Sequence, residues 1–274
     1  NGLNLLDSTT CKFQSYLAGD DPATLSSNSV SAILASANGT LWIGTEYGLN
    51  RFDEASGKFV RYFSSMLVPD GLSANTIFAL YEDRESNLWV GTWGGGISKH
   101  SPAQDKFTLY RADPENPKGF PSEGSFAIYA DPTGIAWIGT AGGGLTRFYP
   151  ANGETIRFAP KTDDPDSLSS VNVWGILRDH DGNLWVANSN GLDRLDEQTG
   201  KFAHYRYDEE NPETSLRGKA VLALYESPDG SFWVGTGKGL DLFDRARGTF
   251  THIVDPQDPQ GATSARIAAI MEDR

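Results

Sequence analysis

The sequence predicts an all-β protein, a β-propeller built from four-stranded antiparallel blades. Two observations carry this prediction: a tryptophan motif that returns at a nearly constant interval, and short apolar segments that surround each copy in the same order. The motif reads LWIGT at 41–45, LWVGT at 88–92, AWIGT at 136–140, LWVAN at 184–188 and FWVGT at 232–236. The tryptophans are 47 or 48 residues apart. A period near 45 residues with four strands in each copy is typical of a propeller blade.

Each copy contains four segments with strand character. An apolar run begins twelve residues before the tryptophan, for example VSAIL at 30–34, and the tryptophan motif itself is the second strand. A glycine turn leads to a third strand such as GLNRF at 48–52, and an aromatic segment such as KFVRY at 58–62 is the fourth. Turns rich in Gly, Asn, Asp and Pro separate the segments, and helical periodicity is absent.

Residue types within each copy indicate how the blades pack. The first strand is apolar on both faces, as expected for an inner strand between neighbouring blades. Its third residue is always small, which suits blades that converge near a central axis: Ala32, Ala79, Ala127, Gly175, Ala223 and Ala269. We expect each recurring tryptophan to pack against the adjacent blade. The small residue two positions later would leave room for the indole: Gly44, Gly91, Gly139, Ala187 and Gly235.

The repeats predict a single propeller domain over residues 1–274. Its parts are two outer strands at 1–16, complete blades at 28–63, 75–110, 123–159, 171–206 and 219–254, and the inner strand of a further blade at 265–274. Two arrangements fit the partial blades. The termini could share one blade and close a six-bladed ring, or the chain could be a fragment of a larger propeller.

Composition excludes several classes of function. The chain has 23 Lys and Arg against 36 Asp and Glu, a formal net charge of −13, so we expect no nucleic-acid partner. No apolar run approaches the roughly 18 residues that a membrane-spanning helix needs. The single cysteine, Cys11, cannot form an internal disulfide, and no signal peptide is visible.

The copies resemble the two-component regulator propeller repeat. That repeat has a loop ending in Ser-Leu-Ser-x-Asn, a strand, the segment Asp-x-x-Gly-x-Leu-Trp-Ile-Gly-Thr, then Gly-Leu-x-Arg-Phe-Asp and an aromatic strand. The chain carries it as TLSSNSVSAILASANGTLWIGTEYGLNRFDEASGKFVRY at 24–62 and again at 167–205, and departs from it at FPSEGS in the third blade and VAN in the fourth.

The resemblance implies the sensor portion of a membrane-bound bacterial signalling protein. Such a portion lies on the periplasmic or extracellular side of the inner membrane, with a histidine kinase or another output domain across the membrane. Members of this family with a known ligand are similar to carbohydrate sensors.

Positions that differ between copies are the candidates for ligand contact, because a scaffold repeats and a binding site need not. The turns from second to third strands share one propeller face with the entrances to the first strands. Trp93, Tyr47 and Lys238 lie in these turns. An aromatic ring suits the apolar face of a sugar. The alternative for Trp93 is that it covers the edge of the next blade.

Polar residues at the entrances form a second candidate group. They are Asn75, Glu123, Arg217, Lys219 and Arg266, a mixed set of donors and acceptors able to bind hydroxyl groups or a carboxylate. The alternative is that they are solvated loop charges. Trp174, which lies close to one entrance, is assigned to the core.

Neither a catalytic site nor a cofactor or metal site is predicted. The four histidines fall on different strands and turns, without metal-ligand spacing: His100, His180, His204 and His252. The segment DHDGN at 179–183 begins like a calcium loop, but Asn190 stands where that loop needs glutamate, so it is assigned to a tight turn. The glycines at 94–96 lead to no helix and hold no phosphate.

Three functions remain. The first is a ligand-binding sensor module that performs no chemistry, whose small-molecule ligand, such as an oligosaccharide, shifts the population of the propeller or of a homodimer. The second is a scaffold that binds other proteins. The third is a lyase-type propeller enzyme, which needs a histidine on the binding face, where none of the four is expected.

Overall fold

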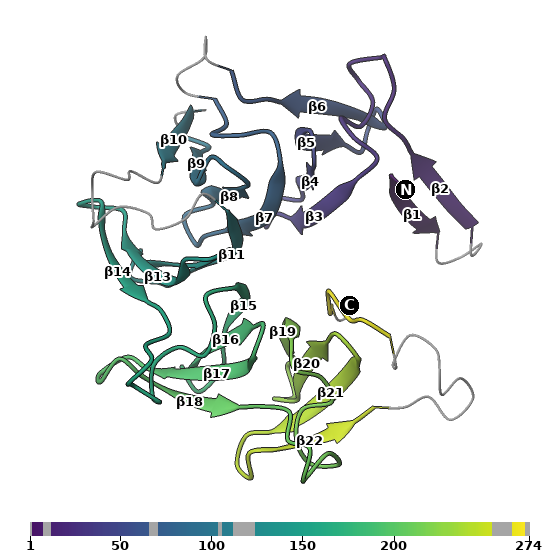
Figure 1. The fold of residues 1–274 in the computed structure, drawn as a ribbon. Helices are drawn as coiled ribbons and strands as arrows, with labels where there is room; N and C mark the ends of the chain where they lie inside the picture. The colour runs from purple at the N-terminus through teal and green to yellow at the C-terminus, as the bar shows by residue number, and fades with distance from the viewer. Residues whose placement is uncertain are drawn as a thin grey trace. The chain divides into compact units, whose positions relative to one another are not determined.

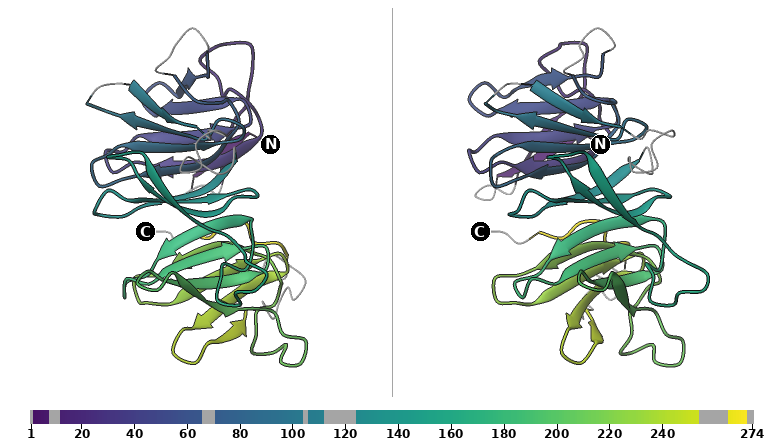
Figure 2. Two further views of the ribbon diagram at one scale, coloured as in Figure 1. Left: turned by 60° about the vertical axis from the view of Figure 1, so that its left-hand side comes forward. Right: turned by 90° about the vertical axis from the view of Figure 1, so that its left-hand side faces the viewer.

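The computed structural model describes residues 2–7, 12–65, 71–103, 106–111, 124–253 and 265–271. Every regular element in these ranges is a β-strand, and the ribbons of Figure 2 contain no helix. Within the same ranges, therefore, no helix is long and apolar enough to cross a membrane.

The strands of the described ranges form one sheet of two and five sheets of four (Figure 1). The two-stranded sheet is β1 (Leu3–Asp7) and β2 (Lys12–Tyr16). The first full sheet is β3 (Val30–Ala35), β4 (Leu41–Thr45), β5 (Gly48–Asp53) and β6 (Lys58–Tyr62). The second is β7 (Ile77–Glu82), β8 (Leu88–Thr92), β9 (Ile97–Ser101) and β10 (Lys106–Tyr110).

The remaining sheets repeat this order. The third is β11 (Ser125–Ala130), β12 (Ala136–Thr140), β13 (Gly144–Tyr149) and β14 (Glu154–Phe158). The fourth is β15 (Val173–Arg178), β16 (Leu184–Asn188), β17 (Gly191–Asp196) and β18 (Lys201–Tyr205). The fifth is β19 (Val221–Glu226), β20 (Phe232–Thr236), β21 (Gly239–Asp244) and β22 (Thr249–His252). Strands adjacent in sequence are adjacent in each sheet, so the predicted all-β propeller blades are confirmed.

The chain divides into two compact units, and the division runs through the third sheet. Unit 1 is Asn1–Ala136 with Phe148–Thr155, and unit 2 is Trp137–Arg147 with Ile156–Arg274. Within unit 1, β3 lies beside β7 and β7 beside β11, and within unit 2, β15 lies beside β19 (Figure 1). The sequence predicted a single domain that is either a closed six-bladed ring or a fragment of a larger propeller. These predictions concern both units together, and they stay predictions.

The recurring tryptophans pack against the neighbouring sheet, as expected. In unit 1, Trp42 joins an apolar cluster with Ile77, Leu88 and Val90 of the second sheet. In unit 2 the Trp185 ring lies 5.2 Å from Phe232 and 5.4 Å from Phe243 of the fifth sheet. Each buried indole thereby joins the apolar cores of two sheets.

The small residues after the tryptophans have a different role from the expected one. A Cβ built on Gly44 would lie 2.6 Å from the Ile77 side chain, and one on Gly139 would lie 2.5 Å from Val173. Both contacts come from the first residue of the next sheet's inner strand. The glycines therefore admit that neighbouring strand rather than the indole of their own strand.

The small third residue of the inner strand faces the same glycine. Ala32 is paired with Gly44, Ala79 with Gly91 and Ala223 with Gly235. In the fourth sheet the two residue types are exchanged, since Gly175 is paired with Ala187. One methyl group fits between each pair of strands, and this local packing accounts for the small third residue.

A β-bulge interrupts the inner strands at their second residue. The register shifts between Val30 and Ala32, Ile77 and Ala79, Val173 and Gly175, and Val221 and Ala223. A bulge re-aims the side chain of the extra residue. The residue at this position differs from sheet to sheet: Ser31, Phe78, Phe126, Trp174 and Leu222.

The second strand is the most deeply buried, rather than the first. All five residues of β8, β12 and β16 are buried, whereas most residues of the inner strands β7 and β15 are partly exposed. The inner strand is an edge strand of its sheet, while the second strand has neighbours on both sides. The apolar composition of the inner strands therefore did not predict their partial exposure.

The segment expected to form a further inner strand makes one backbone hydrogen bond to the fifth sheet but does not form a strand. Residues 265–271 form no strand, and residues 272–274 lie outside the described ranges. Even so, the Ile267 amide donates to the Thr236 carbonyl at 2.9 Å, and Ile267 occupies the space beside Gly235. Ile267 thus meets the fifth sheet as Ile77 meets the first, and within the described residues no second strand pairs with it.

Candidate functional site

Three aromatic side chains meet on unit 1 around Trp93. The Trp93 ring lies 5.9 Å from Phe78 and 5.8 Å from Phe126, and those two phenylalanines are 4.9 Å apart. Phe78 and Phe126 are the second residues of β7 and β11. Trp93 is 52% exposed although it contacts both rings. The three rings, called the aromatic cluster below, form an apolar surface open to solvent.

The backbone holds Trp93 firmly in its turn. The Trp93 amide donates to the Thr76 carbonyl at 2.9 Å, and Trp93 forms an isolated bridge with Gly124. Gly95 follows at a place where a Cβ would lie 2.7 Å from the backbone of Ser73, so the turn needs glycine there. The glycines at 94–96 therefore shape a turn that presents Trp93.

Tyr47 lies in the corresponding turn of the first sheet and is 60% exposed. Its ring is 5.5 Å from Phe63, which is also exposed. Thr76 connects the two turns, because its hydroxyl donates to the Glu46 carbonyl at 3.1 Å while its carbonyl accepts from Trp93. Both predicted aromatic residues thus lie on the same side of unit 1.

Two of the predicted polar site residues hold loops in place. The Asn75 side-chain oxygen accepts from the Ser64 amide at 2.7 Å, as Asn28 does from Ala18. The Arg217 amide donates to the buried Asp241 carboxylate at 2.9 Å, the contact that Ser169 makes with Asp193. A repeated contact is a property of the scaffold.

The other predicted residues of unit 2 are exposed. Lys219 and Arg266 extend to solvent, and the Lys238 amino group lies over the Tyr207 ring, 5.7 Å from its centre. Glu123 lies outside the described residues. The structure therefore brings Lys238 to an aromatic ring that the sequence did not single out.

Trp174 is a candidate that the sequence assigned to the core. It is half-buried, and its indole nitrogen donates to the Ser189 hydroxyl at 3.0 Å, in the turn between β16 and β17. Like Phe78 and Phe126 in unit 1, it is the second residue of its inner strand. The signal that could have identified it is the variable second residue between two nearly invariant neighbours.

The DHDGN segment is a tight turn, as predicted. Asp179 accepts from the Asn183 amide at 2.7 Å and from the Trp185 indole at 2.8 Å. Burial raises the pKa of Asp179, but hydrogen bonds from Trp185, Asn183 and Arg245 outweigh burial and hold the pKa below its usual value. Within the described ranges, no group of three or more His, Cys, Asp or Glu side chains could hold a metal ion.

Two histidines anchor the long loops between sheets. His204 Nδ1 lies 2.7 Å from the buried Asp193 carboxylate, and its Nε2 lies 2.9 Å from the Pro165 carbonyl. His252 makes the same two contacts, with Asp241 at 2.7 Å and Pro212 at 2.8 Å. Both ring nitrogens of His204 face acceptors, so the doubly protonated ring satisfies both. These histidines fasten the scaffold.

We expect the stability of the protein to fall as pH rises above neutrality, partly through His204. The hydrogen bond to Asp193 raises the pKa of His204, and burial opposes it. Because the folded pKa exceeds that of the unfolded chain, the stabilisation is complete below about pH 6.5 and is lost as pH rises through the folded pKa. Urea unfolding between about pH 6 and pH 9 should show a shallower pH dependence in His204→Gln than in the wild type.

Gln198→Ala is the control, because the Gln198 side chain is exposed and carries no titratable group. This variant should keep the pH dependence of the wild type. If the unfolding free energy depends on pH equally in the wild type and in His204→Gln, His204 does not contribute to the pH dependence and the prediction is wrong.

Known families and structures agree with this architecture. The profile of the two component regulator propeller family matches residues 24–47, 71–94, 167–190 and 215–238. The chain is similar to the extracellular domain of a hybrid two component system of B. thetaiotaomicron, with 26% identity and a TM-score of 0.72 over 86% of this chain and 32% of that one. A second such domain from B. thetaiotaomicron is 19% identical, with a TM-score of 0.56 over 93% of this chain and 39% of that one.

Virginiamycin B lyase from Staphylococcus aureus has the same kind of fold at 16% identity, with a TM-score of 0.59 over 89% of this chain and 74% of that one. No curated protein matches the chain significantly. The chain spans about a third of the length of the two B. thetaiotaomicron domains. The chain thus carries four copies of the two-component regulator propeller repeat, and each matched copy contains the first two strands of a four-stranded sheet.

Proposed function

We propose that this propeller is the ligand-sensing part of a membrane-bound bacterial signalling protein of the two-component type, placed outside the cytoplasm. Its ligand is a carbohydrate or another small molecule that binds at the aromatic cluster of unit 1. The names of the two B. thetaiotaomicron domains support the signalling role and the location. The ligand class rests on the chemistry of the exposed rings.

The observation that carries the proposal is the exposure of Trp93 on a rigid turn. A ring 52% exposed while packed against two phenylalanines presents an apolar plate at little cost in conformational entropy. Sugar rings have an apolar face that stacks on such a plate, and neighbouring polar groups bind the hydroxyls. The aromatic cluster occurs at positions where the repeats differ, as recognition requires and a scaffold does not.

The arrangement of three of the four histidines supports a role without catalysis. His204 and His252 are engaged with buried aspartates and loop carbonyls, and His100 is buried beside Phe107, 4.9 Å between ring centres. A general base needs access to the substrate proton. The likeness to the lyase, at 16% identity, concerns the fold.

Trp93→Ala should weaken ligand binding strongly while leaving the fold intact. The test is a thermal-shift screen of oligosaccharides and small metabolites, followed by calorimetry on the hits. We expect a ligand that raises the wild-type melting temperature and a loss of affinity of about tenfold or more in the variant, corresponding to at least about 1.4 kcal/mol. The apo melting temperature should change little, because half of the ring is already in water.

Phe13→Ala is the matched control. Phe13 is 68% exposed and lies in β2, outside the aromatic cluster, so its removal should leave ligand affinity unchanged. Equal affinity in the wild type and Trp93→Ala would refute the site, and capture of proteins alone would favour the scaffold function.

A further inference from the structure

The repeats allow one position to be compared in both units. Glu82 ends the inner strand of the second sheet, and Glu226 ends that of the fifth. Each accepts a backbone amide from the turn of the preceding sheet: Ala37 to Glu82 at 2.9 Å and His180 to Glu226 at 2.8 Å. The two carboxylates therefore occupy equivalent places and are held by equivalent bonds.

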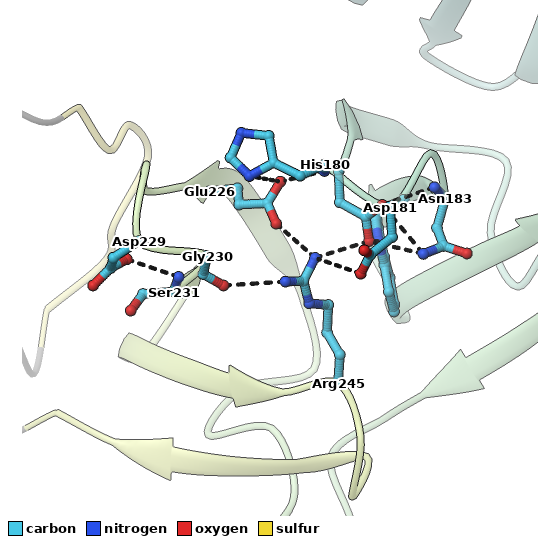
Figure 3. A network of polar contacts seen from close by, with 10 residues as sticks. His180, Asp181, Asn183, Glu226, Asp229, Gly230, Ser231 and Arg245 are labelled. Carbon is cyan, nitrogen blue, oxygen red and sulfur yellow. Dashed lines mark hydrogen bonds and ion pairs between the residues drawn. The ribbon is translucent and has the colours of Figure 1, made fainter.

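In unit 2 a guanidinium group fills the space beside this carboxylate (Figure 3). Arg245 donates to Glu226 at 2.6 Å and to Asp179 at 3.0 Å, and its second nitrogen donates to the Gly230 carbonyl at 3.1 Å. The guanidinium also lies over the Phe232 ring, 5.6 Å from its centre. In unit 2, therefore, the glutamate at this position binds a guanidinium group.

In unit 1 the equivalent space, beside Glu82, is a cavity of about 180 Å³. Pro102 stands where the alignment of the repeats places Arg245, and it lines this cavity together with Glu82, Trp42 and His100. Among the described residues, no cation lies within ion-pair distance of Glu82, although Arg51 also lines the cavity. The counterpart of Arg51 is Arg194, which lies over the Trp185 ring and coexists with Arg245 in unit 2.

We infer that this cavity of unit 1 is a second binding site, for a small ligand that carries a guanidinium group. Glu82 accepts hydrogen bonds from the guanidinium as Glu226 does from Arg245, and the Trp42 and His100 rings border it. The net charge of −13 attracts cations to the protein. Ser36 and Asn38 stand where the counterpart has Asp179 and Asp181, so the site has two carboxylates fewer than the surroundings of Arg245, and we expect weak binding.

Titration with methylguanidinium chloride at constant ionic strength tests the site. In two-dimensional ¹H–¹⁵N NMR spectra, the Ala37 amide and the Trp42 indole signals should move in a saturable manner. Glu82→Gln keeps the shape of the side chain and removes its charge, and binding should weaken about tenfold, as expected for the loss of a hydrogen bond to a charged group. Methylammonium should bind more weakly, because it has one nitrogen with donors where guanidinium has three.

Pro102→Arg provides a test that does not depend on a destabilising change. The new guanidinium should fill the cavity, raise the melting temperature and abolish methylguanidinium binding. Glu226→Gln is the matched control and should leave the titration unchanged, since Arg245 already occupies that space. The inference fails if the wild type shows no saturable shift, if Glu82→Gln binds as well as the wild type, or if Pro102→Arg still binds the probe. None of these outcomes depends on whether Trp93 binds a sugar.

Discussion

Replacement of Trp185 by alanine is expected to lower the unfolding free energy of the protein by about 3–5 kcal/mol, the largest loss from any single substitution considered in this chain. The ring is 1% exposed and packs against Phe232, Phe243 and Tyr205. Its removal opens a cavity between the fourth and fifth sheets that rigid strands on both sides cannot close. Urea unfolding followed by circular dichroism measures the loss.

Two further variants separate the causes of this loss. Trp185→Phe keeps much of the apolar ring but removes the hydrogen bond to Asp179, so it should cost about 1–2 kcal/mol. Trp233→Ala removes the equivalent residue of the fifth sheet, which is only half-buried, and should cost less than Trp185→Ala. Equal losses at Trp185 and Trp233 would show that packing against the next sheet is not the cause.

Gly91→Ala is expected to cost about 1–3 kcal/mol, although it adds a single methyl group. The new Cβ would lie 2.8 Å from the Ser125 carbonyl oxygen and 3.1 Å from the Ala79 Cβ. The first of these atoms belongs to the backbone of β11, so the inner strand of the next sheet has to move. Thermal unfolding of the variant should show a lower melting temperature than that of the wild type.

Gly237→Ala is the matched control, since no atom lies within 4 Å of a Cβ built there and its φ angle suits alanine. It should be neutral or slightly stabilising. The double variant Gly91→Ala with Ala79→Gly reproduces the Gly175–Ala187 arrangement of the fourth sheet and should recover part of the loss. If the double variant is as unstable as Gly91→Ala, one methyl group per pair of strands is not the packing rule.

The sequence was sufficient for the architecture because the repeat makes the same local information available five times. The interval between tryptophans, the four segments per copy and the glycine turns each predict a blade without reference to distant residues. The packing of Trp42 and Trp185 against the next sheet follows as well, since an amphipathic sheet of this size has no other apolar surface to cover an indole.

Reasons for individual residues were harder to predict. Gly91 was expected to make room for an indole of its own strand, whereas it admits Ser125 from another sheet. Trp174 was assigned to the core, whereas it is half-buried and its indole nitrogen donates to the Ser189 hydroxyl. Asn75 and Arg217 hold loops through contacts that recur in other sheets, which the sequence did not indicate, and their contact with a ligand stays a prediction.

The sequence by itself determined the strands, their order within each sheet and the exposed turn that carries Trp93, because these depend on periodicity and on neighbours close in the chain. Only the tertiary structure decided that Phe78 and Phe126 join Trp93. It also decided that Arg245 fills the space beside Glu226, while the equivalent space beside Glu82 is an open cavity. Those outcomes depend on which side chains of adjacent sheets meet. Strand periodicity carries no information about such meetings, since it specifies a face of one sheet and not the atoms opposite it.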